Sequence, residues 1–317
     1  MFDYGHGFVV PFFIFENKYM SKFINIKCAS HALGDTLACV PVVDYYRKVY
    51  SVENINFDCA EWLWSYLSPV YPFLNFCKID NPDIVIDYHF DLPVQKGFAY
   101  DLFQIPKEMK YDFHWEFIEP KIFFEPKPKY IMNEYFTFSI HSTAQVKYWN
   151  SGSRAEQSES PRWRDLCLLL HNIGIQGVMV DKHYGFGNAP HWNEPPKNCK
   201  VVIGRPFDEV LNTIYHSKFY VGLSSGLSWV ALALGKKTCM IAPWTYPDNE
   251  FGESNENHIR VKSNSHCTDC WTKYSVQFDK NDWYWCPQKK DTTEEFICSS
   301  SISAKDVFQE LKNYKWI

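Results

Sequence analysis

Residues 23–37 read FINIKCASHALGDTL, and this stretch decides the fold class. Residues 23–28 predict a β-strand, Ala29–Gly34 form a turn of small residues, and the spacing of apolar residues from Asp35 to Lys48 predicts a helix. Further short strands are expected at Ile55–Phe57 and Ile84–Ile86, with a helix at Trp62–Tyr66 between them. The first half therefore alternates strands and helices, as a parallel sheet requires.

Three prolines between Pro120 and Pro128 are typical of a linker, because proline interrupts both helices and central strands. We place a domain boundary there, which gives domains of residues 1–125 and 126–317. Beyond the linker, strands are expected at Phe136–Ile140, Gly177–Val180, Val201–Ile203, Phe219–Gly222 and Thr238–Ile241. Helices are expected at Trp163–Asn172, Asp208–Tyr215, Leu227–Leu234 and Lys305–Lys312. The second half is thus predicted to be a second α/β unit.

Bulk composition excludes several classes of protein. The 317 residues are 46% hydrophobic and 18% aromatic, so a folded globular chain is expected. A net charge of -5 without a basic run argues against a nucleic-acid partner. The longest early apolar stretch, Phe8–Phe15, is interrupted by Pro11 and follows Asp3, which predicts neither a signal peptide nor a membrane span. Eleven cysteines in a large chain without a leader indicate a reducing, cytoplasmic environment.

Asp35 is the first candidate catalytic residue, since it follows Gly34 at the start of the first long helix. Ligands of α/β sheets bind at this edge, where a carboxylate can act as a general base. The same position is equally compatible with a residue that merely caps the helix.

A second candidate site follows the first strand of the second half. Lys147 there could neutralise a diphosphate, while Thr143 and Gln145 could bind sugar or phosphate oxygens. A solvated surface lysine is the alternative interpretation. His141, just before this segment, is interpreted as a core or surface histidine.

A third candidate site is the sequence from Gly222 to Trp229, which joins a strand to a helix through small residues. Backbone N–H groups of Ser224, Ser225, Gly226 and Leu227 at such a helix start are suited to an anion. An ordinary strand-to-helix turn would have the same sequence.

Four cysteines near the C-terminus give the sharpest pattern: Cys267 and Cys270 in a CxxC turn, then Cys286 and Cys298. Four thiolates can complete a tetrahedral site for zinc or iron. Because sulfur would fill every position, we expect a structural site that stabilises a finger of residues 264–299. Two disulfides or four core thiols are the alternatives. The other seven cysteines are expected in the core.

The motifs together resemble the bacterial autotransporter heptosyltransferases, relatives of the lipopolysaccharide heptosyltransferases in glycosyltransferase family 9. The matching segments are Leu33–Ala38 with Pro41, Ser142–Asn150, Gly222–Trp229, Thr245–Phe251, Cys267–Trp271, Phe278–Asp279, Trp285–Pro287 and Phe296–Cys298.

The resemblance implies a GT-B fold, in which two Rossmann-like domains face a cleft, and inverting transfer of heptose from ADP-heptose to a protein serine or threonine. It implies that Asp35 is the catalytic base, Lys147 the diphosphate lysine, Ser225-Gly226 the phosphate turn and the cysteines an iron finger, with zinc as the chemical alternative. In the loop Thr245–Phe251, Thr245 and Glu250 are further candidate donor-binding residues, and Glu250 could bind the ribose. A homo-oligomer is also expected.

Some features depart from the family. Only about twenty residues precede Phe23, whereas protein-modifying members have a longer N-terminal extension, so an acceptor-recognition element is expected to be missing. Two other interpretations stay open at this point. The first is a GT-B enzyme that uses another nucleotide sugar with a glycan or lipid acceptor, and the second is an inactive interaction protein built around a metal ribbon.

Overall fold

The computed structural model describes residues 23–89, 91–142, 147–149, 161–181, 195–245, 250–270 and 285–317. Its first sheet has the order β3-β2-β1-β4, and all of its strand pairs are parallel. These strands are β1 (Ile24–Cys28), β2 (Ile55–Asp58), β3 (Leu74–Phe76) and β4 (Ile84–Ile86). The predicted parallel α/β unit in the first half is confirmed.

The second sheet is also parallel and has the order β10-β9-β8-β5-β6-β7. Its strands are β5 (Tyr135–Phe138), β6 (Gln176–Asp181), β7 (Lys200–Ile203), β8 (Tyr220–Leu223), β9 (Thr238–Ile241) and β10 (His258–Val261). In both sheets the chain starts in the middle, winds outward, and returns to the other side. This is the doubly wound order, with its reversal between β1 and β4 and between β5 and β8.

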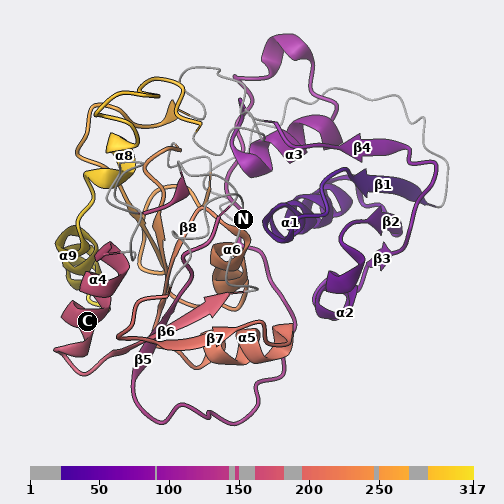
Figure 1. The fold of residues 1–317 in the computed structure, drawn as a ribbon. Coiled ribbons are helices and arrows are strands. Elements are labelled where there is room, and N and C mark those ends of the chain that lie inside the picture. Colours follow the sequence, from indigo (N-terminus) through magenta and orange to yellow (C-terminus); the bar gives the residue numbers. More distant parts are fainter. Residues whose placement is uncertain are drawn as a thin grey trace, which may run out of the picture.

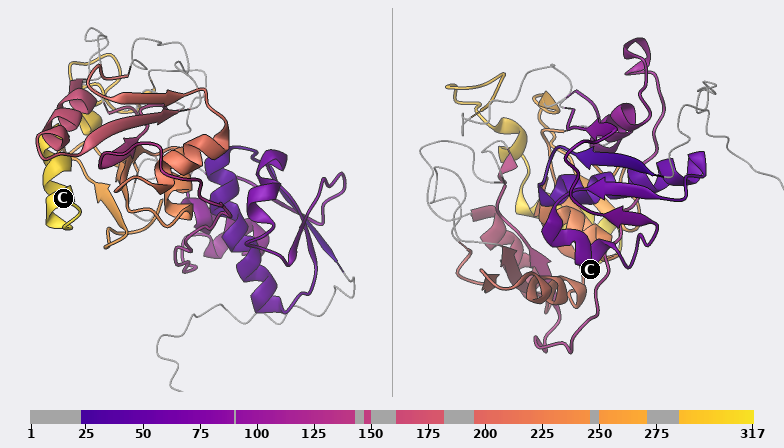
Figure 2. Two further views of the ribbon diagram at one scale, coloured as in Figure 1. Left: turned by 90° about the horizontal axis from the view of Figure 1, so that it is seen from below. Right: turned by 90° about the vertical axis from the view of Figure 1, so that its right-hand side faces the viewer.

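Helices cover both sheets (Figure 1). In the first unit they are α1 (Leu33–Tyr50), α2 (Trp64–Leu67) and α3 (Val94–Leu102), with 3₁₀ turns at Glu61–Leu63 and Lys107–Met109. In the second unit they are α4 (Pro161–His171), α5 (Phe207–Tyr215), α6 (Gly226–Ala233), α8 (Ile297–Ser300) and α9 (Ala304–Asn313). Figure 2 shows the two units as separate lobes, and the long helix α1 lies on the side of its lobe that faces the other.

The expected elements differ from the observed ones in a few places. The helix predicted at Trp62–Tyr66 is divided into the 3₁₀ turn and the single-turn α2. Among the described residues, the 3₁₀ turn Lys107–Met109 and four strands or α-helices were not predicted: β3, α3, β10 and α8. Each lacks a clear pattern, because β3 and α8 are only three and four residues long, α3 contains Gly97, and β10 contains a histidine and an arginine.

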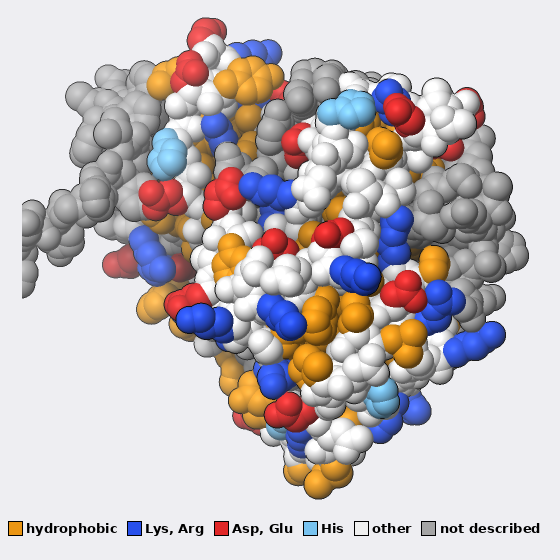
Figure 3. Space-filling view, turned by 90° about the vertical axis from the view of Figure 1, so that its left-hand side faces the viewer, with side chains coloured by type: hydrophobic (Ala, Val, Ile, Leu, Met, Phe, Trp, Pro, Cys, Tyr) orange, Lys and Arg blue, Asp and Glu red, His pale blue; other side chains and the backbone are white. Residues whose placement is uncertain are grey.

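The core runs from the first sheet through α1 and α6, and a second cluster packs α4 and α9 against the other sheet. Of the seven cysteines expected in the core, Cys77 and Cys199 are only partly buried, which corrects that expectation. None of the described helices has the length and apolarity that a bilayer crossing requires. The face that carries α4 and α9 mixes acidic and basic side chains with small apolar areas (Figure 3). The described side chains of that face form no continuous basic stripe.

Candidate active site

The two reversal points bring three chain segments to the same region. The carboxyl end of β1 leads into α1, while the ends of β5 and β8 lead into the lysine segment and into α6. In doubly wound sheets, ligands bind at such points because the helices on either side leave in opposite directions. Three of the predicted sites therefore lie at positions where this topology places ligands.

The starts of α1 and α6 approach each other closely at two glycines. A Cβ added to Gly226 would lie 3.0 Å from the Cβ of Leu33 and 3.1 Å from the backbone nitrogen of Gly34. A Cβ added to Gly34 would lie 3.2 Å from Cδ1 of Trp229. Glycine at both positions lets two helix N-termini meet across the two units, and both carry partial positive charge. The convergence is suited to an anionic ligand.

Asp35 lies in the first turn of α1, and the hydroxyl of Ser30 donates a hydrogen bond to its carboxylate at 2.5 Å. The N-cap of α1 is Ala32, which has extended backbone and no side-chain cap. Asp35 is therefore not the N-cap, because the helix begins two residues earlier than expected, but its carboxylate in the first turn still suits the helix dipole. The catalytic role of Asp35 stays a prediction.

Lys147 is partly buried, with its ammonium nitrogen 4.7 Å from the centre of the Trp244 ring. Burial lowers the pKa of Lys147, and the negative charges of Glu250 and Asp35 act in the opposite direction. The alternative of a solvated surface lysine does not fit this position. Lys147, Glu250 and Asp35 come from three different segments, and the fold brings them within electrostatic range of one another.

The loop after β9 carries Thr245 and Glu250, both buried. Oε2 of Glu250 has no hydrogen-bond partner among the residues that the structure describes. A buried carboxylate oxygen without a donor is costly, so it indicates a place for a ligand hydroxyl. This geometry suits the predicted contact with ribose.

Arg260 in β10 was not predicted, although it organises this loop. Its guanidinium donates to the carbonyl oxygens of Glu250 at 3.0 Å, Thr245 at 3.2 Å and Ala242 at 3.3 Å, and to the hydroxyl of Thr245. Arg260 is itself buried. A planar guanidinium with several donors can hold several carbonyls at once, so Arg260 fixes the backbone on both sides of the loop.

The strand-to-helix loops at the second reversal point are also joined. Ser142 donates through its hydroxyl to the carbonyl of Ser224 at 3.2 Å. Nearby, Nδ1 of His141 lies 2.5 Å from Oδ2 of Asp181, and both side chains are buried. His141 was interpreted as a core or surface histidine, and it lies in the core beside an acid.

The predicted phosphate turn is at the start of α6, where Ser225 has extended backbone as the N-cap and Gly226 is the first helical residue. Ser224 is buried and Leu227 is partly buried. Of the remaining predicted donor residues, Thr143 and Gln145 lie outside the described residues. The binding roles of all these residues stay predictions.

A cavity of about 220 Å³ lies between the two units beside Trp229. Residues from the start of α3, from the segment 113–117 and from the second unit line it. Because Trp229 also contacts Gly34 at the start of α1, this cavity borders the convergence of the two helices.

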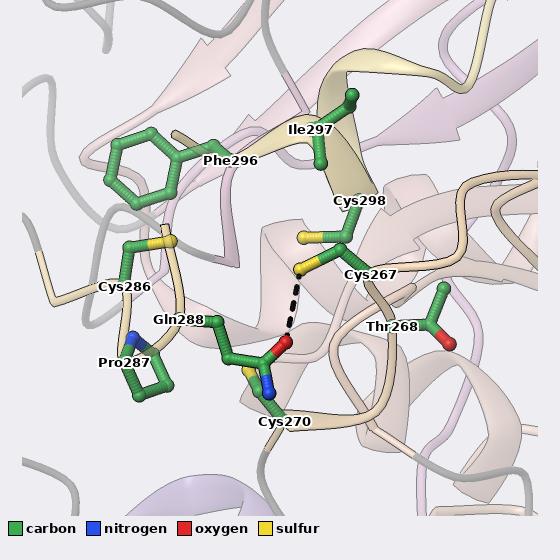
Figure 4. Close-up of a pocket in the computed structure, with 9 residues that line it drawn as sticks. All are labelled: Cys267, Thr268, Cys270, Cys286, Pro287, Gln288, Phe296, Ile297 and Cys298. Atoms are coloured by element: carbon green, nitrogen blue, oxygen red, sulfur yellow. Dashed lines mark hydrogen bonds between the residues drawn. The ribbon is translucent and has the colours of Figure 1, made fainter. Parts of the chain in front are cut away.

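The four cysteines of the predicted finger line one small cavity of about 10 Å³, together with Gln288 and Phe296 (Figure 4). All four are buried, and Cys267 donates to Oε1 of Gln288 at 3.6 Å. Burial and the neighbouring thiols raise the pKa of Cys298 to about 12. No group of three or more potential ligands within the described residues stands at metal-binding separations. The thiols are gathered, but the metal site stays a prediction.

The donor set nevertheless fits a metal that prefers sulfur. Four thiols and no carboxylate line the cavity, whose volume is about that of a single water-sized group. The alternative of disulfides does not fit, because all eleven cysteines are free thiols.

Comparison with curated proteins finds several relatives of one kind. The chain is 28% identical over 305 residues to the autotransporter heptosyltransferase TibC of Escherichia coli O78:H11, covering 92% of this chain and 71% of TibC. It is 28% identical over 297 residues to the autotransporter heptosyltransferase BAHTCr of Citrobacter rodentium, covering 87% of this chain and 66% of that protein. The chain is homologous to the autotransporter heptosyltransferases. No protein-family model matches it.

Another relative, BimC of Burkholderia thailandensis, is described as an inactive autotransporter heptosyltransferase; it is 28% identical over 168 residues, which cover 51% of this chain and 38% of BimC. Relatives of this chain thus include proteins described as enzymes and one described as inactive.

Solved structures share the fold. The dodecameric, iron-containing glycosyltransferase TibC superposes with a TM-score of 0.77 at 23% identity, over 92% of this chain and 75% of TibC. TibC in complex with ADP-D-β-D-heptose gives a TM-score of 0.74, also at 23% identity, over 92% of this chain and 76% of that one. The lipopolysaccharide heptosyltransferase II of E. coli gives a TM-score of 0.53 at 12% identity, over 92% of this chain and 98% of that one. TibC, BAHTCr and the lipopolysaccharide heptosyltransferase II are glycosyltransferases, which agrees with the predicted enzyme class.

Proposed function

We propose that this chain is a GT-B glycosyltransferase that transfers heptose from ADP-heptose, with inversion, to a serine or threonine hydroxyl of a protein. The observation that carries the proposal is the convergence of two helix N-termini with Lys147, Glu250 and Asp35 at the reversal points of two parallel sheets. The homology to autotransporter heptosyltransferases, and the ADP-heptose bound by TibC, support heptose as the sugar.

The donor diphosphate would lie against the start of α6, where backbone N–H groups and Lys147 provide positive charge. As the bond to the anomeric carbon breaks, charge builds up on the leaving diphosphate, so these groups stabilise the transition state more than the ground state. Burial has already removed part of the water around Lys147, which strengthens this interaction. Glu250 would accept hydrogen bonds from the ribose hydroxyls through its unpartnered oxygen.

Asp35 would take the proton from the acceptor hydroxyl as its oxygen attacks the anomeric carbon from the face opposite the diphosphate. The hydroxyl of Ser30 holds one carboxylate oxygen of Asp35, which fixes the direction of the other. The cavity beside Trp229 is where we place the acceptor, since it adjoins the start of α1 and is open to both units. Its mixture of aromatic and polar walls suits a peptide segment.

We also propose that Cys267, Cys270, Cys286 and Cys298 hold one metal ion per chain, iron by homology to iron-containing TibC and otherwise zinc. The metal would crosslink segments 267–270, 286 and 298, which are too short to hold a core of their own. By the same homology we propose that the chain forms a homo-oligomer. From its eleven free cysteines we propose that it acts in the cytoplasm. Elemental analysis of protein purified without affinity metals tests the site. About one equivalent is expected, and less than about a tenth of an equivalent in folded protein would exclude it.

The function is tested by incubating the purified chain with ADP-heptose and a serine- and threonine-rich protein fragment. We expect release of ADP together with a mass increase of the acceptor that corresponds to one or more heptose units. Turnover of a different nucleotide sugar instead would favour the alternative donor. Binding of ADP without turnover of any donor would place this chain with inactive relatives such as BimC.

A further inference from the structure

The segments that carry the four cysteines contact one another and also contact the backbone on both sides of the lysine site. Two strips of chain surround Lys147: the lysine's own segment, residues 147–149, and Pro243-Trp244, whose indole ring lies under the ammonium group. Neither strip lies in a strand or a regular helix. Each must be held by contacts from elsewhere in the fold.

The first contact comes from α8, the short helix that carries Cys298. The hydroxyl of Ser299 donates to the carbonyl of Tyr148 at 2.5 Å, and Ser299 is only 1% exposed. One residue further along, the indole N–H of Trp149 donates to the carbonyl of Ile302 at 2.8 Å. The residue next to Lys147 is thus tied directly to the residue next to Cys298.

The second contact comes from the turn between Cys267 and Cys270. The backbone N–H of Asp269, a residue with a left-handed φ of 60°, donates to the carbonyl of Pro243 at 3.1 Å. The sulfur of Cys270 lies 4.0 Å from the carbonyl of Trp244. The backbone bond does not depend on the protonation state of the cysteine, so it is compatible with thiolates bound to a metal.

We propose that the cysteine finger is a two-point clamp that positions Lys147 over Trp244, and that Ser299 is the positioning residue at its α8 end. Through Ser299 the finger sets the position of the lysine segment, and through Asp269 it sets the ring on which the ammonium group rests. The consequence for the donor diphosphate rests on the proposed function, whereas the effect on Lys147 itself does not. The finger would thereby control donor binding as well as stability.

Two serine-to-alanine substitutions with a similar expected cost in stability make the test specific. Ser299→Ala removes the hydrogen bond to Tyr148. Ser303→Ala removes the N-cap of α9, whose hydroxyl, within the described part of the chain, bonds to Asp306 alone. Both changes should lower the melting temperature by a few degrees. Only Ser299→Ala should change the lysine site.

The first measurement needs no ligand. Mass spectrometry follows the rate at which an acylating reagent modifies Lys147 in the free protein, relative to an exposed reference, Lys48. We expect Ser299→Ala to raise the relative rate by roughly five- to tenfold, the equivalent of losing one hydrogen bond, and Ser303→Ala to leave it unchanged. Equal rates in the two variants would overturn the clamp.

The second measurement is the dissociation constant of ADP by calorimetry, in which the stoichiometry separately reports the folded fraction. Ser299→Ala should weaken ADP binding by about fivefold at unchanged stoichiometry. In a Lys147→Met background it should cause no further loss. A full additional loss in that background would mean that Ser299 does not act through Lys147. If the unmodified protein bound no ADP while the labelling rates still differed, the donor assignment would be wrong and the clamp would stand.

Discussion

Replacing Lys147 by methionine should weaken donor binding while leaving the free protein as stable as before, or more so. The lysine is partly buried, its pKa is lowered by that burial, and its ammonium group lies 4.7 Å from the Trp244 ring centre. Because burial lowers this pKa on folding, the charged form is disfavoured in the folded chain. The cost is fully present below the folded pKa and is lost as pH rises from the folded to the unfolded pKa. At neutral pH its charge therefore costs stability, and methionine, which also packs well on an aromatic ring, removes that cost.

The expected loss of ADP binding follows from the hydrogen bond that Lys147 would make to the charged diphosphate. Such a bond contributes about 1.5 to 3 kcal/mol. ADP affinity should fall by roughly 10- to 150-fold. Calorimetry with ADP and a thermal melt of the same preparation test both halves of the prediction. An unchanged ADP affinity, or a melting temperature lowered as much as by a core truncation, would refute the role of Lys147 as a destabilised diphosphate ligand.

Three further outcomes are expected. Because the lowered pKa of Lys147 should rise again beside a diphosphate, ADP binding should weaken as pH rises through the free-protein value and should take up protons in alkaline buffer. Calorimetry in buffers of different ionisation enthalpy measures this uptake, and its persistence in Lys147→Met would assign it elsewhere. Gly226→Ala, whose Cβ would lie 3.0 Å from that of Leu33, should cost about 1–3 kcal/mol of stability and weaken ADP binding as α6 moves off α1. Unchanged stability and unchanged ADP affinity in this variant would mean that α6 can move off α1 without affecting either. Arg260→Met leaves the carbonyls of Ala242, Thr245 and Glu250 without their buried donor, so the free energy of unfolding should fall by about 3 kcal/mol or more. A denaturation midpoint equal to that of the surface variant Arg164→Met would contradict this.

Local sequence patterns were sufficient to predict most of the strands and helices. Ile84–Ile86 and Thr238–Ile241 were predicted with the bounds that the structure has, because both are short apolar runs in a parallel sheet. Thr238–Ile241 is buried throughout, whereas Val85 is exposed in an edge strand. The predicted order of elements also led to the site, since a doubly wound sheet places ligands at its reversal points. Asp35, Lys147 and the start of α6 meet there for that reason.

Interactions between distant segments could not be predicted. Arg260 lies in an unrecognised strand, and its partners are carbonyl oxygens 10 to 18 residues earlier, which leave no mark on the sequence. The bond from Ser299 to Tyr148 spans 151 residues. The start of α1 was predicted two residues too late for a local reason. The helix begins after Ala32, which has no capping side chain, so no sequence signal marks its start.

The central claim is that Asp35 acts as the base in transfer from a nucleotide-heptose donor. The most direct test compares the chain with its Asp35→Asn variant, following ADP release from ADP-heptose and the mass of the acceptor fragment while calorimetry follows ADP binding. We predict that the variant keeps its ADP affinity within about threefold but transfers roughly 10² to 10⁴ times more slowly. Transfer by the variant at the rate of the unmodified chain would contradict the account.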